Sequence, residues 1–253
     1  MTNSAAVCVK DLTAGYYGDP VIHDVTWEVS QGSLAAIIGP NGGGKSTLLK
    51  SLVGLVKRMQ GSVLLFGHEP EQGRRQVAYL SQSEEVDWQF PISVRDVVLQ
   101  GRWLRKGLWG RLSQDDVDKA EDAMARFEIS HLADTQIGSL SGGQRQRVFL
   151  ARAVAQEADL ILLDEPNTGL DARAQHELAD TLISLKKEGR TIIVATHDLD
   201  CLTECFDQVL ALKNSVVAHG TPREVLTAEI LTALFARHFP SLLDTGEVVI
   251  HEP

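Results

Sequence analysis

The sequence predicts an α/β fold in which a mostly parallel sheet is joined by an antiparallel β subdomain and an inserted helical subdomain. Short apolar runs at residues 34–38, 160–164 and 191–196 alternate with helical patterns. Parallel strands joined by crossover helices produce this alternation. Strand patterns are absent between about residues 83 and 155, which indicates a mainly helical insertion in one α/β core.

The N-terminal elements follow from local patterns. Residues 6–32 alternate apolar and polar side chains around turns, as antiparallel strands do. The apolar run LAAII at 34–38 has the length of a buried strand, and KSTLLKSLV at 45–53 has a helical pattern. We therefore expect antiparallel strands first, and then the first strand and helix of the α/β core.

The later elements follow in the same way. Within residues 114–129, one helical stripe is apolar and predicts an amphipathic helix. The stripe consists of Val117, Ala120, Met124 and Phe127. The remaining strands and helices are predicted at 160–164, 171–189, 191–196 and 197–206.

Composition and charge exclude several classes of protein. The chain has 253 residues, of which 43% are hydrophobic, so it can fill a sizeable core. Its formal net charge of -10 argues against a nucleic-acid partner, which needs clustered Lys and Arg. No apolar run has a membrane-spanning length and the first residues lack a signal-peptide pattern, so we expect a cytosolic protein. Three cysteines are too few and too scattered for a disulfide framework.

A glycine-rich loop predicts a phosphate-binding site. GPNGGGKST at 39–47 follows a predicted strand and opens a predicted helix, the context in which G-x-x-x-x-G-K-[ST] binds nucleotides. Glycines let backbone N–H groups converge on phosphates, and the helix N-terminus adds a positive dipole. We expect Lys45 to reach the β- and γ-phosphates and Ser46 to ligate Mg²⁺. The candidate nucleotide-binding residues are Gly39, Asn41, Gly42, Gly43, Gly44, Lys45, Ser46 and Thr47.

Two adjacent carboxylates provide the expected partner of this loop. LILLDEP at 160–166 is an apolar strand ending in Asp164, and ligands of α/β sheets bind at the carboxyl ends of strands. We expect Asp164 to hold Mg²⁺ through its water shell. The adjacent Glu165 is positioned to act as the general base that polarises the attacking water.

A third motif identifies the branch of nucleotide hydrolases. LSGGQRQRVFLARAV at 140–154 places glycines and Ser141 before a helix, which makes a second anion-binding helix terminus. Two chains paired head to tail would use both termini, each closing over a phosphate held by the other. The motif resembles the signature of ATP-binding cassette (ABC) proteins, and the resemblance extends from about residue 7 to 226.

The resemblance implies roles for single residues. Tyr17 resembles the aromatic residue that stacks on adenine, with Tyr16 as a less favoured neighbour. Gln82 resembles the Q-loop glutamine, which contacts Mg²⁺ and links the core to the helical subdomain. His197 matches the switch histidine that contacts the γ-phosphate. The residues that match the signature and the D-loop aspartate are Ser141, Gly143, Gln144 and Asp171.

An aromatic segment just after Gln82 lies where the family docks membrane subunits. Exposed aromatic and apolar residues rimmed by charge are typical of interface cores, whereas the alternative is that they pack the helical subdomain. The segment at 83–103 also resembles cassettes that drive manganese or zinc uptake. The docking candidates are Val86, Trp88, Phe90, Pro91 and Val94.

The resemblance implies an ABC-type P-loop NTPase. Its expected parts are a nucleotide-binding core with the β subdomain (1–82 and 156–228), a helical subdomain (83–155) and a short tail (229–253). We expect an Mg²⁺-dependent ATP hydrolase working as a homodimer that encloses two ATP molecules. It would lie on the cytoplasmic face of the membrane, bound to permease subunits near Trp88 and Phe90 and served indirectly by a substrate-binding protein.

The expected cargo is manganese, zinc or a related transition metal. One alternative is a cassette for ferric-siderophore or cobalamin uptake, because that group shares VRDVV at 94–98. Another is a non-transport ABC ATPase, which would need long coiled coils or two cassettes. The third is a nucleotide-binding module without turnover, which the presence of Glu165 and His197 disfavours.

Overall fold

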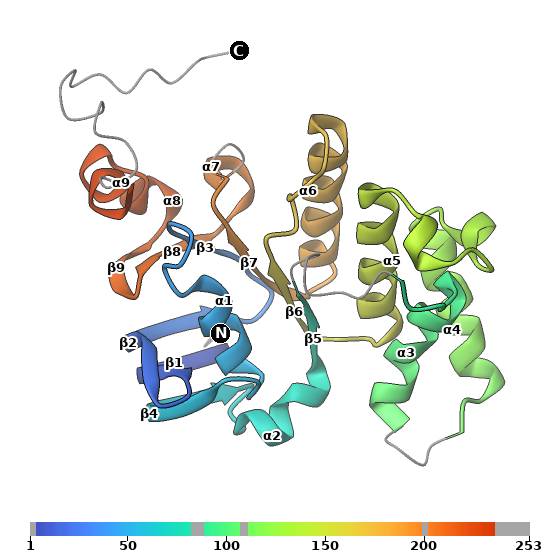
Figure 1. Ribbon diagram of the computed structural model, residues 1–253, viewed down its shortest axis with the longest axis horizontal. Coiled ribbons are helices and arrows are strands. Elements are labelled where there is room, and N and C mark those ends of the chain that lie inside the picture. Colours follow the sequence, from blue (N-terminus) through green and yellow to red (C-terminus); the bar gives the residue numbers. More distant parts are fainter. Residues whose placement is uncertain (1–3, 82–88, 107–110, 199–201, 236–253) are drawn as a thin grey trace.

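The computed structural model describes residues 4–81, 89–106, 111–198 and 202–235, and it contains two sheets that share one helix (Figure 1). The smaller sheet is antiparallel, with strand order β2-β1-β4. Its β1 and β2 are the antiparallel strands expected for residues 6–32, and they pair with each other. Its third strand, β4, was not predicted. The bounds are β1 Ala5–Tyr16, β2 Asp19–Ser30 and β4 Lys57–Leu65.

The larger sheet has six strands in the order β5-β6-β7-β3-β8-β9, and only the β8–β9 pair is antiparallel. Every residue of β3, β6 and β7 is buried, as expected for central strands covered on both faces. The predicted parallel core is therefore correct. The bounds are β3 Leu34–Ile38, β5 Val77–Leu80, β6 Leu160–Asp164, β7 Thr191–Thr196, β8 Gln208–Lys213 and β9 Ser215–Gly220.

Helix α1 (Lys45–Leu52) packs between the two sheets. Leu48, Leu49 and Leu52 are buried in a hydrophobic cluster that draws residues from both sheets. This packing fixes the start of α1 beside the carboxyl ends of β3 and β6. The other helices of this part are α2 Pro70–Gly73, α6 Ala172–Lys187, α7 Leu202–Cys205, α8 Pro222–Val225 and α9 Ala228–Phe235.

Three packed helices make up most of the region between residues 89 and 155 (Figure 1). Val98, Met124 and Val148 come from different helices and meet in one buried cluster that continues into the sheet. The described part of this region contains no strand longer than a bridge, in agreement with the predicted helical insertion. The helices are α3 Val94–Lys106, α4 Gln114–Arg126 and α5 Gly142–Ala155.

A buried charged cluster joins these three helices at one end. Arg102 of α3 contacts Asp116 of α4 (Nε–Oδ1 3.1 Å), and its Nη1 donates to the Ala155 carbonyl at 2.6 Å and to Glu157 at 2.9 Å. Lys106 also contacts Asp116 at 2.7 Å. Arg102 and Asp116 are almost fully buried. The ends of α3, α4 and α5 are therefore held together by charge-assisted hydrogen bonds.

The C-terminal region differs from the expected tail. Residue 229 falls inside α9, and Leu234 of this helix packs against Ile38 and Val209 in a third cluster. The core thus extends to the end of the described chain. A second difference concerns the helix expected at 197–206: residues 197, 198 and 206 are not helical, and the described helix is α7 at Leu202–Cys205. Across the described ranges, no helix combines the length and apolarity that crossing a bilayer requires.

Candidate active site

The glycine-rich loop lies between β3 and α1 as predicted. Gly44 caps α1 with φ 94, and a Cβ there would lie 2.4 Å from Cγ2 of Ile22. At Gly39 a Cβ would lie 2.0 Å from the Leu212 carbonyl oxygen. Both positions therefore require glycine, the first for backbone conformation and close contact, the second for close contact. The loop is packed against the β2 and β8 regions and is held in a fixed shape.

The Lys45 ammonium is buried within its own loop. Its Nζ donates to the carbonyl oxygens of Gly39 at 2.9 Å and Pro40 at 3.3 Å, and it forms an ion pair with Glu165 Oε1 at 3.1 Å. Lys45 is 5% exposed and Glu165 is 10% exposed. An anion bound by Lys45 would therefore meet the Glu165 carboxylate at the same place.

Asp164 ends β6 opposite the first turn of α1. Ser46 Oγ donates to its Oδ1 at 3.0 Å and Tyr79 Oη donates to its Oδ2 at 3.2 Å. Burial raises the pKa of Asp164, while the two hydrogen bonds from Ser46 and Tyr79 act in the opposite direction. Ser46 and Asp164, expected to share one Mg²⁺, are in direct contact.

Glu165 connects the loop to the end of β7. Its Oε2 lies 2.6 Å from Nδ1 of His197, and its backbone N–H donates to the Ala195 carbonyl at 2.9 Å. Glu165 has φ 50, a conformation that a non-glycine residue adopts only at some energetic cost. The backbone hydrogen bond and the two side-chain contacts hold the residue in this conformation. The carboxylate thus lies between Lys45 and His197.

Lys45, Glu165 and His197 line one cavity of about 380 Å³, the phosphate-loop cavity. Its walls combine backbone N–H groups, one ammonium, one carboxylate and one imidazole, so it suits a polyanion near a general base. The size is within the range of small-molecule sites. The lining residues are Val21, Pro40, Asn41, Gly42, Gly43, Gly44, Lys45, Ser46, Thr47, Glu165, Thr168 and His197.

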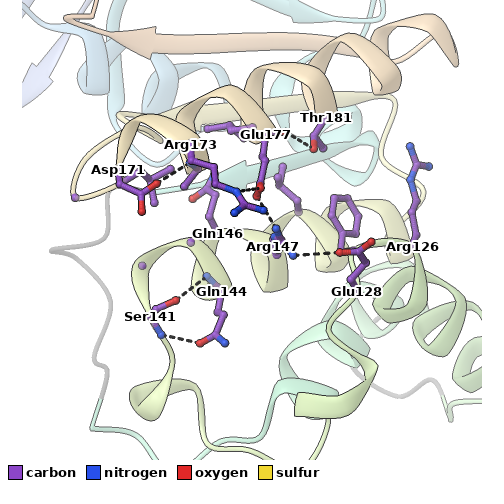
Figure 2. A pocket seen from close by; sticks show the side chains of 18 residues that line it. Arg126, Glu128, Ser141, Gln144, Gln146, Arg147, Asp171, Arg173, Glu177 and Thr181 are labelled. Atoms are coloured by element: carbon purple, nitrogen blue, oxygen red, sulfur yellow. Dashed lines mark hydrogen bonds and ion pairs between the residues drawn. The ribbon is translucent and has the colours of Figure 1, made fainter.

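The signature residues line a different cavity, of about 630 Å³, between α5 and α6 (Figure 2). Ser141 caps α5: its Oγ accepts from the Gln144 N–H at 3.3 Å, and its own N–H donates to Gln144 Oε1 at 2.9 Å. Asp171 caps α6 by accepting from the Ala174 N–H at 2.8 Å. Ser141, Gly143, Gln144 and Asp171 thus lie together but line none of the phosphate-loop cavity.

The remaining predicted site residues have mixed outcomes. Gln82, and Val86 and Trp88 of the docking segment, lie outside the described residues. Tyr17 lies at the β1–β2 turn with a fully exposed side chain, and it does not line the phosphate-loop cavity.

The docking candidates that the structure describes divide into two groups. Phe90 is 60% exposed and Pro91 is also exposed, as an interface requires. Val94 is 0% exposed and packs in the core of the helical region. Its prediction as a docking residue was therefore wrong, because Val94, Val97 and Val98 form the inward face of α3.

Two contributors to the site were not predicted. Thr168 lines the phosphate-loop cavity and also the neighbouring cavity that contains Asp164. Tyr79 contacts Asp164 from β5, the strand beside β6. The sequence signal that could have identified Tyr79 is a tyrosine hydroxyl near the end of the strand that precedes Gln82.

The fold and the site define a P-loop nucleotide-binding protein. The loop, the buried lysine and the strand-end carboxylates all lie at the carboxyl edge of a parallel sheet, where nucleotides bind in such folds. Comparison with known proteins narrows the class. The model of the ABC transporter family matches residues 22–168, more than half of the chain. The chain belongs to this family and is a nucleotide-binding ATPase of the kind that drives ABC transporters.

Curated relatives cover nearly the whole chain. The manganese transport system ATP-binding protein MntB of Bacillus subtilis is 41% identical and covers 93% of this chain and 94% of its own length. The zinc transport system ATP-binding protein TroB of Treponema pallidum is 42% identical, with coverage of 94% and 90%. The similarity therefore includes the segments outside the family match.

Solved structures agree in fold. An inward-facing conformation of an ABC transporter assigned to the metal-chelate type gives a TM-score of 0.81 at 31% identity, covering 92% of this chain and 89% of the other. The cbiO1 subunit from Clostridium perfringens, part of the ABC transporter complex cbiONQ, gives 0.75 at 28% identity, covering 94% and 96%. The two-sheet architecture with a helical region is thus that of an ABC ATPase.

Proposed function

We propose that this chain is the Mg²⁺-dependent ATP-hydrolysing subunit of an ABC importer for manganese, zinc or a related transition metal. The observation that carries the hydrolytic part is the Glu165 carboxylate, which lies between Lys45 and His197 in the phosphate-loop cavity. The metal cargo is supported by relatives named for manganese and zinc transport at 41% and 42% identity.

The residues near Glu165 fit a magnesium ion. Mg²⁺ prefers oxygen ligands, and the Ser46 hydroxyl and the Asp164 carboxylate lie 3.0 Å apart at the start of α1. Ser46 would ligate the ion directly, Asp164 would hold its water shell, and Gln82 would add a contact from the adjoining segment. When bound, the ion neutralises negative charge on the β- and γ-phosphates.

Residues of the chain itself would bind the nucleotide and activate the attacking water. Backbone N–H groups of the glycine-rich loop and Lys45 bind the phosphates, and Tyr17 stacks on the base. Glu165 accepts a proton from the attacking water, and His197 orients Glu165 and contacts the γ-phosphate. Glu165 must leave Lys45 when a phosphate arrives, because both anions need the same ammonium.

The second cavity supports a head-to-tail homodimer. The N-terminus of α5 is a second anion-binding terminus, and its cavity is separate from the phosphate-loop cavity. One chain has no phosphate of its own to place there. Two chains would close each signature segment over the ATP of the other, with Asp171 at the junction. Binding of ATP would then close the dimer and hydrolysis would reopen it.

Permease subunits are the proposed membrane partners. Phe90 exposes 60% of its surface beside the start of α3, and Trp88 lies two residues before it in the sequence. An exposed aromatic residue of this kind is a typical interface anchor. This contact would hold the chain on the cytoplasmic face of the membrane, while a substrate-binding protein would act on the permease from the other side.

The test is the Glu165→Gln variant. We expect it to reduce ATP turnover by at least 100-fold, since general-base catalysis contributes about 10²–10⁴-fold. The matched control is Glu71→Gln, an exposed residue of α2, which should keep wild-type turnover. Turnover of Glu165→Gln within a few-fold of wild type would refute the assignment of the base.

Cargo is tested separately, in cells that carry the complete transporter. The whole-cell content of all transition elements is compared between cells with the native chain and cells with Glu165→Gln. The manganese or zinc content should be lower in the cells with the variant. A second candidate, uptake of chelated iron or cobalamin, is favoured by the 31% identity to the metal-chelate type transporter. Loss of chelated-iron or cobalamin uptake with manganese and zinc unchanged would select that candidate.

A further inference from the structure

Among the described residues, Tyr79 of β5 donates a side-chain hydrogen bond to Asp164 from outside both the phosphate loop and β6. Its Oη donates to Asp164 Oδ2 at 3.2 Å, while Ser46 donates to Oδ1 at 3.0 Å. Both carboxylate oxygens therefore have a donor. With Tyr79 on Oδ2, the carboxylate plane is fixed so that Oδ1 faces Ser46.

The position of Tyr79 is itself determined from two sides. Strand β5 pairs in parallel with β6, in a register that places Tyr79 beside Leu162. On the other side, α5 and its C-cap residue contact the backbone of β5. Arg152 Nη2 of α5 donates to the Tyr79 carbonyl at 3.3 Å, and Gln156 Nε2 at the C-cap donates to the Val77 carbonyl at 2.9 Å. The phenol is therefore held in register with the end of β6.

We infer that Tyr79 is a positioning residue for the divalent metal, holding the Asp164 carboxylate in the orientation that metal binding beside Ser46 requires. The inference rests on the proposed Mg²⁺ dependence. Partners that orient metal-binding groups typically contribute 10–100-fold to metal affinity. A phenol suits this role because it donates one hydrogen bond to the carboxylate and adds no charge that would repel a cation.

The alternative is that the Tyr79 hydroxyl only satisfies a buried carboxylate and so stabilises the fold. The two roles differ in one measurable quantity, the ratio of nucleotide affinity with Mg²⁺ to nucleotide affinity in EDTA. A positioning role changes the ratio, because only the metal-loaded state depends on Asp164 orientation. A purely structural role leaves the ratio unchanged.

The experiment is calorimetric titration of the full-length chain with a non-hydrolysable ATP analogue, in excess MgCl₂ and in EDTA. For Tyr79→Phe we expect the affinity ratio to fall about 10-fold, with the affinity in EDTA unchanged. The control, Ser51→Ala, removes another buried hydroxyl, one on α1 that donates only to the Thr47 carbonyl, and it should keep the wild-type ratio. Thermal unfolding of each variant establishes that it is folded.

A wild-type ratio in Tyr79→Phe would overturn the inference, and so would an equal loss of affinity with Mg²⁺ and in EDTA. These results would leave the proposed function intact. If instead the wild-type chain bound the analogue equally well with and without Mg²⁺, the proposed Mg²⁺ dependence would fail, and the role of Tyr79 with it.

Discussion

Replacing Asp116 by Asn should destabilise the helical region strongly, because Asp116 is the centre of the buried charged cluster. Arg102 and Lys106 both pair with it, and Ser113 donates to it from backbone and side chain. Breaking a buried ion pair from one side costs about 3–5 kcal/mol, because the remaining charge stays buried. Here Arg102 keeps Glu157 and the Ala155 carbonyl, so we expect about 3 kcal/mol, the lower end of that range.

The assay is urea unfolding followed by circular dichroism, together with the melting temperature. A loss of about 3 kcal/mol corresponds to a melting temperature lower by about 6–12 °C for a chain of this size. The control is Asp118→Asn, at an exposed residue of the same helix that accepts a hydrogen bond from Gln114. The stability of this variant should stay within about 0.5 kcal/mol of wild type. A change below 0.5 kcal/mol in Asp116→Asn would refute the reasoning.

The same cluster predicts a pH dependence. Hydrogen bonds from Lys106, then Ser113, then Arg102 hold the pKa of Asp116 well below its ordinary value. A depressed carboxyl pKa stabilises the fold above the unfolded value of about 3.9, and this contribution is lost as pH falls towards the folded pKa. Wild type should therefore lose stability below about pH 4 more steeply than Asp116→Asn does. Parallel acid-unfolding curves for the two proteins would contradict this assignment.

Two further predictions concern the phosphate loop. Gly44→Ala should abolish measurable nucleotide binding in calorimetry, because the added Cβ would lie 2.4 Å from Ile22 and the backbone there is left-handed. The control is Gly67→Ala, at a glycine that also has positive φ but has no atom near the added Cβ, and this variant should bind nucleotide normally. Glu165→Gln should bind ADP about 10-fold more tightly, a gain of about 1.4 kcal/mol in binding free energy, because the neutral amide no longer competes with the phosphates for Lys45. An unchanged ADP affinity would show that the ion pair does not oppose nucleotide binding.

The central strands and the nucleotide site could be predicted because their signals are local. Residues 34–38, 160–164 and 191–196 are apolar runs of strand length, and each was observed as a buried strand. The loop at 39–47 is identified by its own glycines and lysine. Its position in the fold follows from the strand before it and the helix after it. Asp164 and Glu165 were predicted in the same way, because they come at the end of an apolar run of strand length.

Non-local packing accounts for what was missed. Strand β4 begins with Lys57 and Arg58 and contains Gly61, so its sequence has little strand character, and pairing with β1 determines its conformation. Val94 was taken for a surface residue because it follows Phe90 and Pro91, whereas the period of α3 turns it inward. The contact between Tyr79 and Asp164 depends on β5 lying next to β6, a strand order that no local pattern contains.

The ion pair between Lys45 and Glu165 implies that a nucleotide phosphate would bind Lys45 by displacing a carboxylate of the chain itself. The Lys45 ammonium is already paired with a carboxylate of the same chain, so the cavity has less net positive charge than its glycine-rich loop alone would suggest. A phosphate that binds Lys45 would release the Glu165 carboxylate at the moment when the proposed general base is needed. Binding of nucleotide and release of the base would then be a single event.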